Sequence, residues 1–192
     1  MRWNAYLPLS AAVLMLSHLC SAVVDRVAVV IDKKIVTESE VLDELRLTEF
    51  FNNQSLELGP KARREAAERL VDQELIRREL KISGYAPPSA NEADALLRKF
   101  RQGRFHSLAD YHAALGKYGI TEEQLKAHLL WQLTAIRFTD QRFRSQLSET
   151  GSQSADRVAD DAPANSVDQQ MDAWLKETRG NTKITFKPEA FQ

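Results

Sequence analysis

Histidine and cysteine are the residues of this chain that could bind a metal ion or act as nucleophile and base. The single cysteine, Cys20, allows neither an intrachain disulfide nor a cysteine metal cluster. His106 and His112 are separated by a predicted helix start with no cysteine nearby, which is not a zinc-ligand spacing. His128 lies one helical turn from Trp131 and is interpreted as a surface or packing histidine. We therefore predict no metal site.

Sequence signatures of common active sites are also missing. The sequence contains no Gly-x-Ser-x-Gly motif, no phosphate-binding glycine loop and no Gly-x-Gly-x-x-Gly motif. The glutamates fall at predicted helix starts or on polar helix faces. These observations predict no catalytic residue, no cofactor and no bound nucleotide, so we expect a protein that is not an enzyme.

The stretch from Leu125 to Leu147 carries apolar residues on two sides of a predicted helix. The stripe expected to face the core consists of Leu125, Leu129, Leu133, Ile136, Phe143 and Leu147. The opposite side consists of Ala127, Trp131, Thr134 and Phe138. A surface helix needs only one apolar face. The second face therefore either packs on another element, such as a helix around Trp174, or is exposed and binds a client polypeptide, which makes those four residues candidate peptide-binding residues.

The overall composition is that of an ordinary globular protein. The chain has 192 residues, 43% hydrophobic and 28% charged, with a formal net charge of −1. Basic clusters such as Lys61 to Arg64 are interrupted by Glu65 and Glu68, as on a solvated helix face. No surface of a single charge sign is therefore expected to recruit nucleic acid or acidic lipid.

Residues 1–22 have the layout of a secretory signal peptide. Arg2 precedes an apolar run from Leu7 to Leu19, and the end at Cys20 to Ala22 places small residues at the cleavage positions. The run is short for a membrane span, which needs about 20 apolar residues. We expect cleavage after Ala22 and a periplasmic protein. Two alternatives stay open: an uncleaved inner-membrane anchor, and a lipoprotein processed at Cys20.

Start and stop signals divide residues 23–147 into a β-hairpin followed by helices. Alternating β-branched residues from Arg26 to Val36 predict the hairpin. Three pairs have the spacing of a capping box and predict helix starts: Thr37 with Glu40, Ser89 with Glu92, and Thr121 with Gln124. A long helix is expected from Pro60 to Ile82, with apolar residues around most of its circumference, and Gly84 and Pro87-Pro88 are expected to break the chain after it. Ser107 is expected to cap a short helix that ends near Gly116 to Gly119.

Composition changes after this helical part. Residues 148–166 are rich in Ser, Asp, Ala and Gln and predict a flexible linker. Residues 167–187 predict an amphipathic helix followed by a strand over Lys183 to Phe186, and residues 188–192 form a short tail. A single strand is not stable alone. We therefore expect it to pair with the N-terminal hairpin, giving a mainly α fold with one small sheet built from both ends of the chain.

Several segments resemble the SurA family of periplasmic chaperones. They are Val24–Val30, Ile35–Val41, Leu70–Ile76, Tyr118–Leu125, and the closing helix and strand at Trp174-Leu175 and Ile184–Phe186. The resemblance covers about residues 24–147 and 167–187. It implies a helical chaperone core completed by the two ends of the chain. Family members commonly carry parvulin-type prolyl isomerase domains between these two parts, where this chain has only residues 148–166.

The resemblance implies a function. It suggests an ATP-independent periplasmic holdase that binds unfolded outer-membrane or secreted polypeptides through apolar surfaces. Its expected partners are unfolded or partly folded polypeptides, with no nucleic acid and no nucleotide, and with membrane contact only through the signal segment. Two alternatives are a prolyl isomerase, for which the chain has no matching active-site residues, and a dedicated partner subunit in envelope assembly.

Overall fold

The computed structural model describes residues 25–144 and 163–192, and residues 1–24 and 145–162 lie outside the described part. Its elements are β1 (Val27–Ile31), β2 (Lys34–Thr37), α1 (Glu38–Asn52), α2 (Pro60–Ser83), α3 (Ala90–Arg104), α4 (Leu108–Tyr118), α5 (Glu122–Thr139), the π-helical turn η1 (Asp140–Arg144), α7 (Pro163–Gly180), β3 (Ile184–Phe186) and the 3-10 turn η2 (Pro188–Phe191). The fold is mostly helical with a small antiparallel sheet, as the sequence predicted.

The sheet joins the two ends of the described chain. Its strand order is β2-β1-β3, and Val30 of β1 is paired with Ile35 on one side and Thr185 on the other. The expected pairing of the C-terminal strand with the N-terminal hairpin is therefore confirmed. Because β1 is the central strand, its ladder is completed by a segment that lies more than 150 positions later in the sequence.

The hairpin turn is fixed by Asp32. This residue adopts a left-handed conformation (φ 53°), which aspartate tolerates better than most residues. Its Oδ1 accepts a hydrogen bond from the backbone N–H of Lys183 at 3.1 Å, and its Oδ2 accepts one from Arg78 of α2 at 2.6 Å. The bond from Arg78 is the main cause that lowers the pKa of Asp32. One side chain thus ties the hairpin to both α2 and the C-terminal strand.

The predicted helix starts are confirmed. The capping boxes at Thr37, Ser89 and Thr121 are all formed, and the hydroxyl of Ser107 accepts from the backbone N–H of Asp110. Gly84 and Gly119 end α2 and α4 in the left-handed conformation that glycine adopts without strain. Local signals therefore determine where most helices begin and end.

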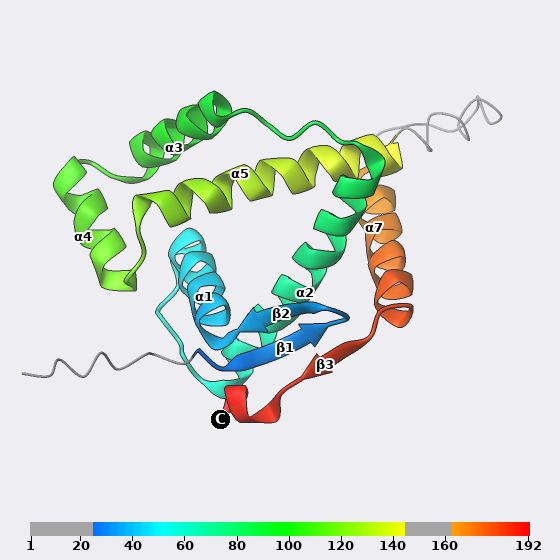
Figure 1. Cartoon of the computed structure of the whole chain (residues 1–192). Coiled ribbons are helices and arrows are strands. Elements are labelled where there is room, and N and C mark those ends of the chain that lie inside the picture. The colour runs from blue at the N-terminus through cyan, green and yellow to red at the C-terminus, as the bar shows by residue number, and fades with distance from the viewer. Residues whose placement is uncertain (1–24, 145–162) are drawn as a thin grey trace, which may run out of the picture.

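The apolar core has two parts. One lies between the sheet, α1 and α2, and its most buried side chains are Ala28, Val29, Ile31, Val41, Ala66, Ala67, Val71 and Leu75. The other lies between the C-terminal half of α1 and helices α3 to α5, and it includes Phe50, Leu97, Tyr111, Leu115, Leu125 and Leu129. Figure 1 shows α5 passing across the ends of α1 and α2, with α3 and α4 near one end and α7 near the other.

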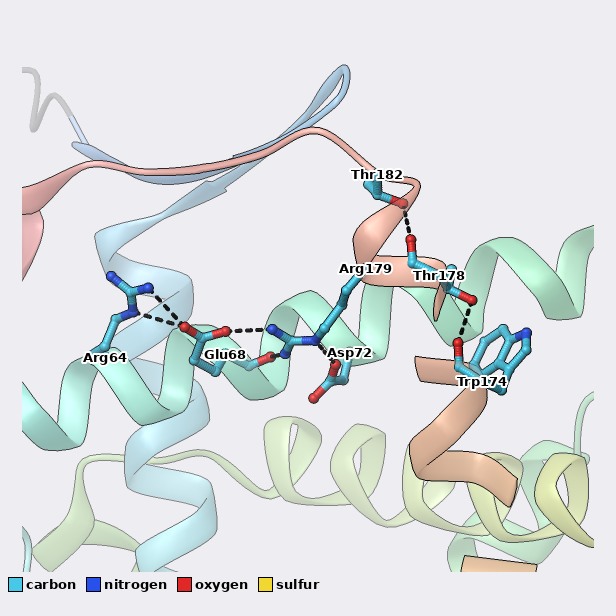
Figure 2. Close-up of polar contacts among 7 residues, drawn as sticks. All are labelled: Arg64, Glu68, Asp72, Trp174, Thr178, Arg179 and Thr182. Atoms are coloured by element: carbon cyan, nitrogen blue, oxygen red, sulfur yellow. Dashed lines mark hydrogen bonds and ion pairs between the residues drawn. The ribbon is translucent and has the colours of Figure 1, made fainter. Parts of the chain in front are cut away.

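Helix α7 docks on α2 through an arginine. Arg179 donates from Nε to Asp72 and from Nη1 to Glu68, both at 2.6 Å, and from Nη2 to the backbone carbonyl of Glu68 at 2.9 Å (Figure 2). The bond to Asp72 is the main cause that raises the pKa of Arg179. On α7, Trp174 packs against Phe138 and Phe143, with ring centroids 5.9 and 6.5 Å apart.

Three boundaries differ from those expected. Helix α7 begins at Pro163, inside the stretch expected to be a linker up to residue 166, because proline suits the first position of a helix. The helix expected to reach Leu147 changes to a π-helical turn after Thr139, and the remaining linker residues lie outside the described part. The expected tail, residues 188–192, forms η2 and buries Ala190 in the core.

Helix α5 also departs from its expected faces. Leu125 and Leu129 are buried under α1, α3 and α4, as expected. Ile136 belongs to the same stripe but is 61% exposed. The partners of α5 change along its length, because α7 contacts its C-terminal end from another side through Phe138. A single apolar face therefore does not run along the whole helix.

Candidate functional site

The four candidate peptide-binding residues of α5 separate into two pairs. Phe138 is 3% exposed and packs on Trp174, and Thr134 is buried with its hydroxyl donating to the backbone carbonyl of Leu130 at 2.8 Å. For these two residues the packing alternative holds, so we remove them from the candidate set. Ala127 is exposed and Trp131 is half-buried, and both line a cleft between α1, α2 and α5.

The cleft consists of two neighbouring cavities of about 270 Å³ each. Both are lined by Glu44 of α1, Gln73 of α2, and His128 and Trp131 of α5. One cavity is also lined by Leu47, Leu70 and Ala127, and the other is also lined by Phe51. The cleft thus combines apolar surface from all three helices with a central group of polar side chains.

Trp131 forms one wall together with an arginine. The guanidinium carbon of Arg77 lies 4.4 Å from the centre of the Trp131 ring, a cation–π contact. Arg77 donates a hydrogen bond to Gln73 at 3.1 Å, and it forms no ion pair with a carboxylate in the described part of the chain. Arg77 is exposed as a whole residue, and partial removal of its guanidinium from water is the main cause that lowers its pKa. Most of its N–H groups therefore remain available to a molecule in the cleft.

A buried carboxylate lies at the centre of the cleft. Glu44 is 7% exposed, and its oxygens accept from Arg69 at 3.2 Å, from Gln73 at 3.1 Å and from Thr48 at 3.2 Å. These donors come from both α1 and α2. Because a buried carboxylate needs such partners, Glu44 fixes the relative position of the two helices beside the cleft.

His128 links the third helix to this centre. Its ring lies 5.7 Å from that of Phe51, and its Nε2 is 3.0 Å from the amide nitrogen of Gln132. Burial is the main cause that lowers the pKa of His128; the Glu44 carboxylate raises it and Arg69 lowers it. His128 is therefore favoured as a neutral side chain. Because its Nε2 can only accept from the amide group of Gln132, the ring proton is on Nδ1, which is left as a hydrogen-bond donor.

The positions of His106 and His112 can be compared with the spacing of metal ligands. His106 is exposed and so is His112, whose nearest aromatic neighbour is Tyr111 on the same helix. Within residues 25–144 and 163–192, no group of three or more His, Cys, Asp or Glu side chains is arranged to hold a metal ion.

Sequence reasoning missed the polar residues of the cleft: Glu44, Arg69, Gln73 and Arg77. A signal was present for Glu44, which is three residues after Val41 and adjacent to Leu45, on the apolar side of its helix. A charged residue at such a position must find a partner when the helix packs. The sequence does not show which residues of α2 are the partners of Glu44. This helix carries arginines along its whole length, so Arg69 does not differ from the others in the sequence pattern.

Comparisons with protein-family models and curated proteins give no match. The resemblance to the SurA family therefore stays a hypothesis based on the quoted segments. Within the described residues, no helix is both long enough and apolar enough to span a bilayer.

Proposed function

We propose that this protein is an exported, nucleotide-independent chaperone-type module that holds segments of non-native polypeptide in the cleft between α1, α2 and α5. The observation that carries the proposal is the composition of the cleft around Trp131. Leu47, Leu70 and the indole ring offer apolar surface, and Arg77 and His128 offer hydrogen-bond donors.

Such a lining suits a polypeptide better than a small charged metabolite. A backbone carries both carbonyl acceptors and N–H donors, and the side chains of an unfolded segment bring apolar surface. The charges that line the cleft are mixed, with Glu40, Asp43 and Glu44 facing Arg77, so no single ionic group is selected. The resemblance to the SurA family supports the same class of partner, and the layout of residues 1–22 supports export.

Replacement of Trp131 tests the proposal. Trp131→Ala removes the largest apolar side chain of the cleft, and because this side chain is half-exposed we expect a stability loss of about 1–2 kcal/mol, below the 3–5 typical of a buried aromatic. Suppression of aggregation of a chemically unfolded test protein should fall at least about threefold. The measurement is light scattering of the test protein with increasing amounts of chaperone.

Ile136→Ala is the matched control. Ile136 is on the same helix and more exposed than Trp131, and it lines neither cavity of the cleft. The control should suppress aggregation as well as the natural chain does. Equal loss in both variants would show that exposed apolar surface in general, and not the cleft, holds the client; no loss in Trp131→Ala would reject the cleft as the binding site.

A further inference from the structure

A larger cavity lies beside the cleft, between α1, α2 and the loop that joins them. Its volume is about 490 Å³, within the range of small-ligand sites. It is lined by Leu45, Thr48, Glu49, Gln54, Ser55, Glu57, Ala62, Glu65 and Arg69. Thr48 and Arg69 also line the cleft, so the two spaces are neighbours.

Glu49 at this cavity differs from Glu44 although the two are equally buried. Both are 7% exposed and lie on the same helix. Glu44 has an arginine, an amide and a hydroxyl as partners. Glu49 accepts one hydrogen bond, from the backbone N–H of Glu57 at 2.7 Å to Oε2. Within the described part of the chain, its Oε1 has no donor and no basic side chain forms an ion pair with it.

The other charged groups of the cavity do not compensate this carboxylate. Glu57 and Glu65 add negative charge, and the one ion pair of Glu65 among the described residues is with the exposed Lys61, at 3.9 Å. Arg69 is the one basic residue of the lining, and its guanidinium pairs with Glu44. A carboxylate with little exposure and no positive partner is held less favourably than a paired one. A cation that enters the cavity would supply that partner.

We propose that this cavity receives a basic side chain, a lysine ammonium or an arginine guanidinium, of the polypeptide bound in the cleft, with Glu49 as its counter-ion. This inference rests on the proposed function and adds to it a preference for polypeptides that carry basic side chains. A polypeptide lying in the cleft passes Thr48 and Arg69 at the border between the two spaces. A long basic side chain can enter there while its apolar stem stays beside Leu45.

The first experiment measures the site without requiring a whole client. The ¹⁵N-labelled chain is titrated with Nα-acetyl-lysine methylamide, and the amide signal of Glu57, which donates to Glu49, is followed by NMR. We expect a saturable shift with this probe and none with the norleucine analogue, which has the same chain without the charge. The shift should be absent in Glu49→Gln, whose side chain still accepts from Glu57, and unchanged in Glu123→Gln, an exposed carboxylate on α5. No saturable shift in the natural chain, or an equal shift in Glu49→Gln, would overturn the proposal.

The second experiment separates this inference from the proposed function. Two labelled apolar peptides that differ only in a central lysine or norleucine are bound to the full chain and followed by fluorescence anisotropy. We expect the lysine peptide to bind about tenfold more tightly, a difference that Glu49→Gln removes and Glu123→Gln retains. Equal binding of both peptides rejects the basic-side-chain site and leaves the polypeptide cleft standing. If neither peptide binds, the cleft is rejected as a polypeptide site. The NMR titration alone then tests whether the cavity at Glu49 binds a basic side chain.

Discussion

At the scale of single residues, Glu44 and Glu49 of α1 have the same burial and different surroundings. The carboxylate of Glu44 joins α1 to α2 through Arg69 and Gln73. That of Glu49 has one backbone donor and faces a cavity. Burial of a charge is tolerated when it is paired and hydrogen-bonded, and it costs stability when it is not. We infer that Glu44 stabilises the folded protein and that Glu49 binds a basic side chain of the client.

Opposite effects on stability are expected when the two glutamates are neutralised. Glu44→Gln leaves Arg69 without its partner and should lower the free energy of unfolding by about 1–3 kcal/mol. Glu49→Gln keeps the acceptor for Glu57 and removes an unpaired charge, so it should raise that free energy by about 1 kcal/mol and Tm by about 2–4 °C. Thermal unfolding of both variants at neutral pH checks this, and a lower Tm for Glu49→Gln would show that its charge has a partner in the free protein.

At the scale of elements, the helix starts, the breaks at Gly84 and Gly119 and the pairing of the terminal strand could be predicted from the sequence. Capping boxes and positive-φ glycines act within a few residues, so their signals are local. For the second apolar face of α5 the sequence left two alternatives, packing or exposure, because Ile136 and Phe138 are both apolar and their exposure depends on where α7 docks. Ala127 and Trp131 are candidates from the sequence alone, but the polar residues of the cleft were missed, because those side chains meet only when three helices pack.

The C-terminal segment should be required for the stability of the sheet. Deletion of residues 181–192 removes β3 and η2, exposes one edge of the central strand and uncovers the core around Ala190. It also removes Phe186, whose ring lies 3.5 Å from the guanidinium carbon of Arg64. Loss of several partly buried apolar side chains should cost several kcal/mol, comparable with the net stability of a domain.

Differential scanning calorimetry tests this expectation. The truncated chain should melt at least about 10 °C lower or show no cooperative transition, given about 2–4 °C per kcal/mol for a chain of this size. Thr185→Ala, an exposed position of the same strand, should change the melting temperature little. If the truncated and full chains melted at the same temperature, the pairing of the two ends would be unimportant for stability.

At the scale of the whole molecule, both ends of the described chain meet in one sheet, and the helices between them form the cleft and the neighbouring cavity. The N-terminal residues before Asp25 are outside the described part, and their role in export is a proposal. We predict that expression in a bacterium with export of the chain yields a mature form beginning at Val23. Intact-mass analysis checks this, and a retained Met1 or a lipid on Cys20 would contradict it.

The central claim is that non-native polypeptide binds in the cleft between α1, α2 and α5. Site-specific photo-crosslinking tests it most directly. A photoreactive amino acid replaces Ala127, an exposed residue at the cleft. In a control, the same amino acid replaces Leu108, which is exposed on α4 and lines none of the three cavities. We predict crosslinks to an unfolded outer-membrane polypeptide from position 127 and few from position 108. Equal yields from both positions, or none from position 127, would contradict the account.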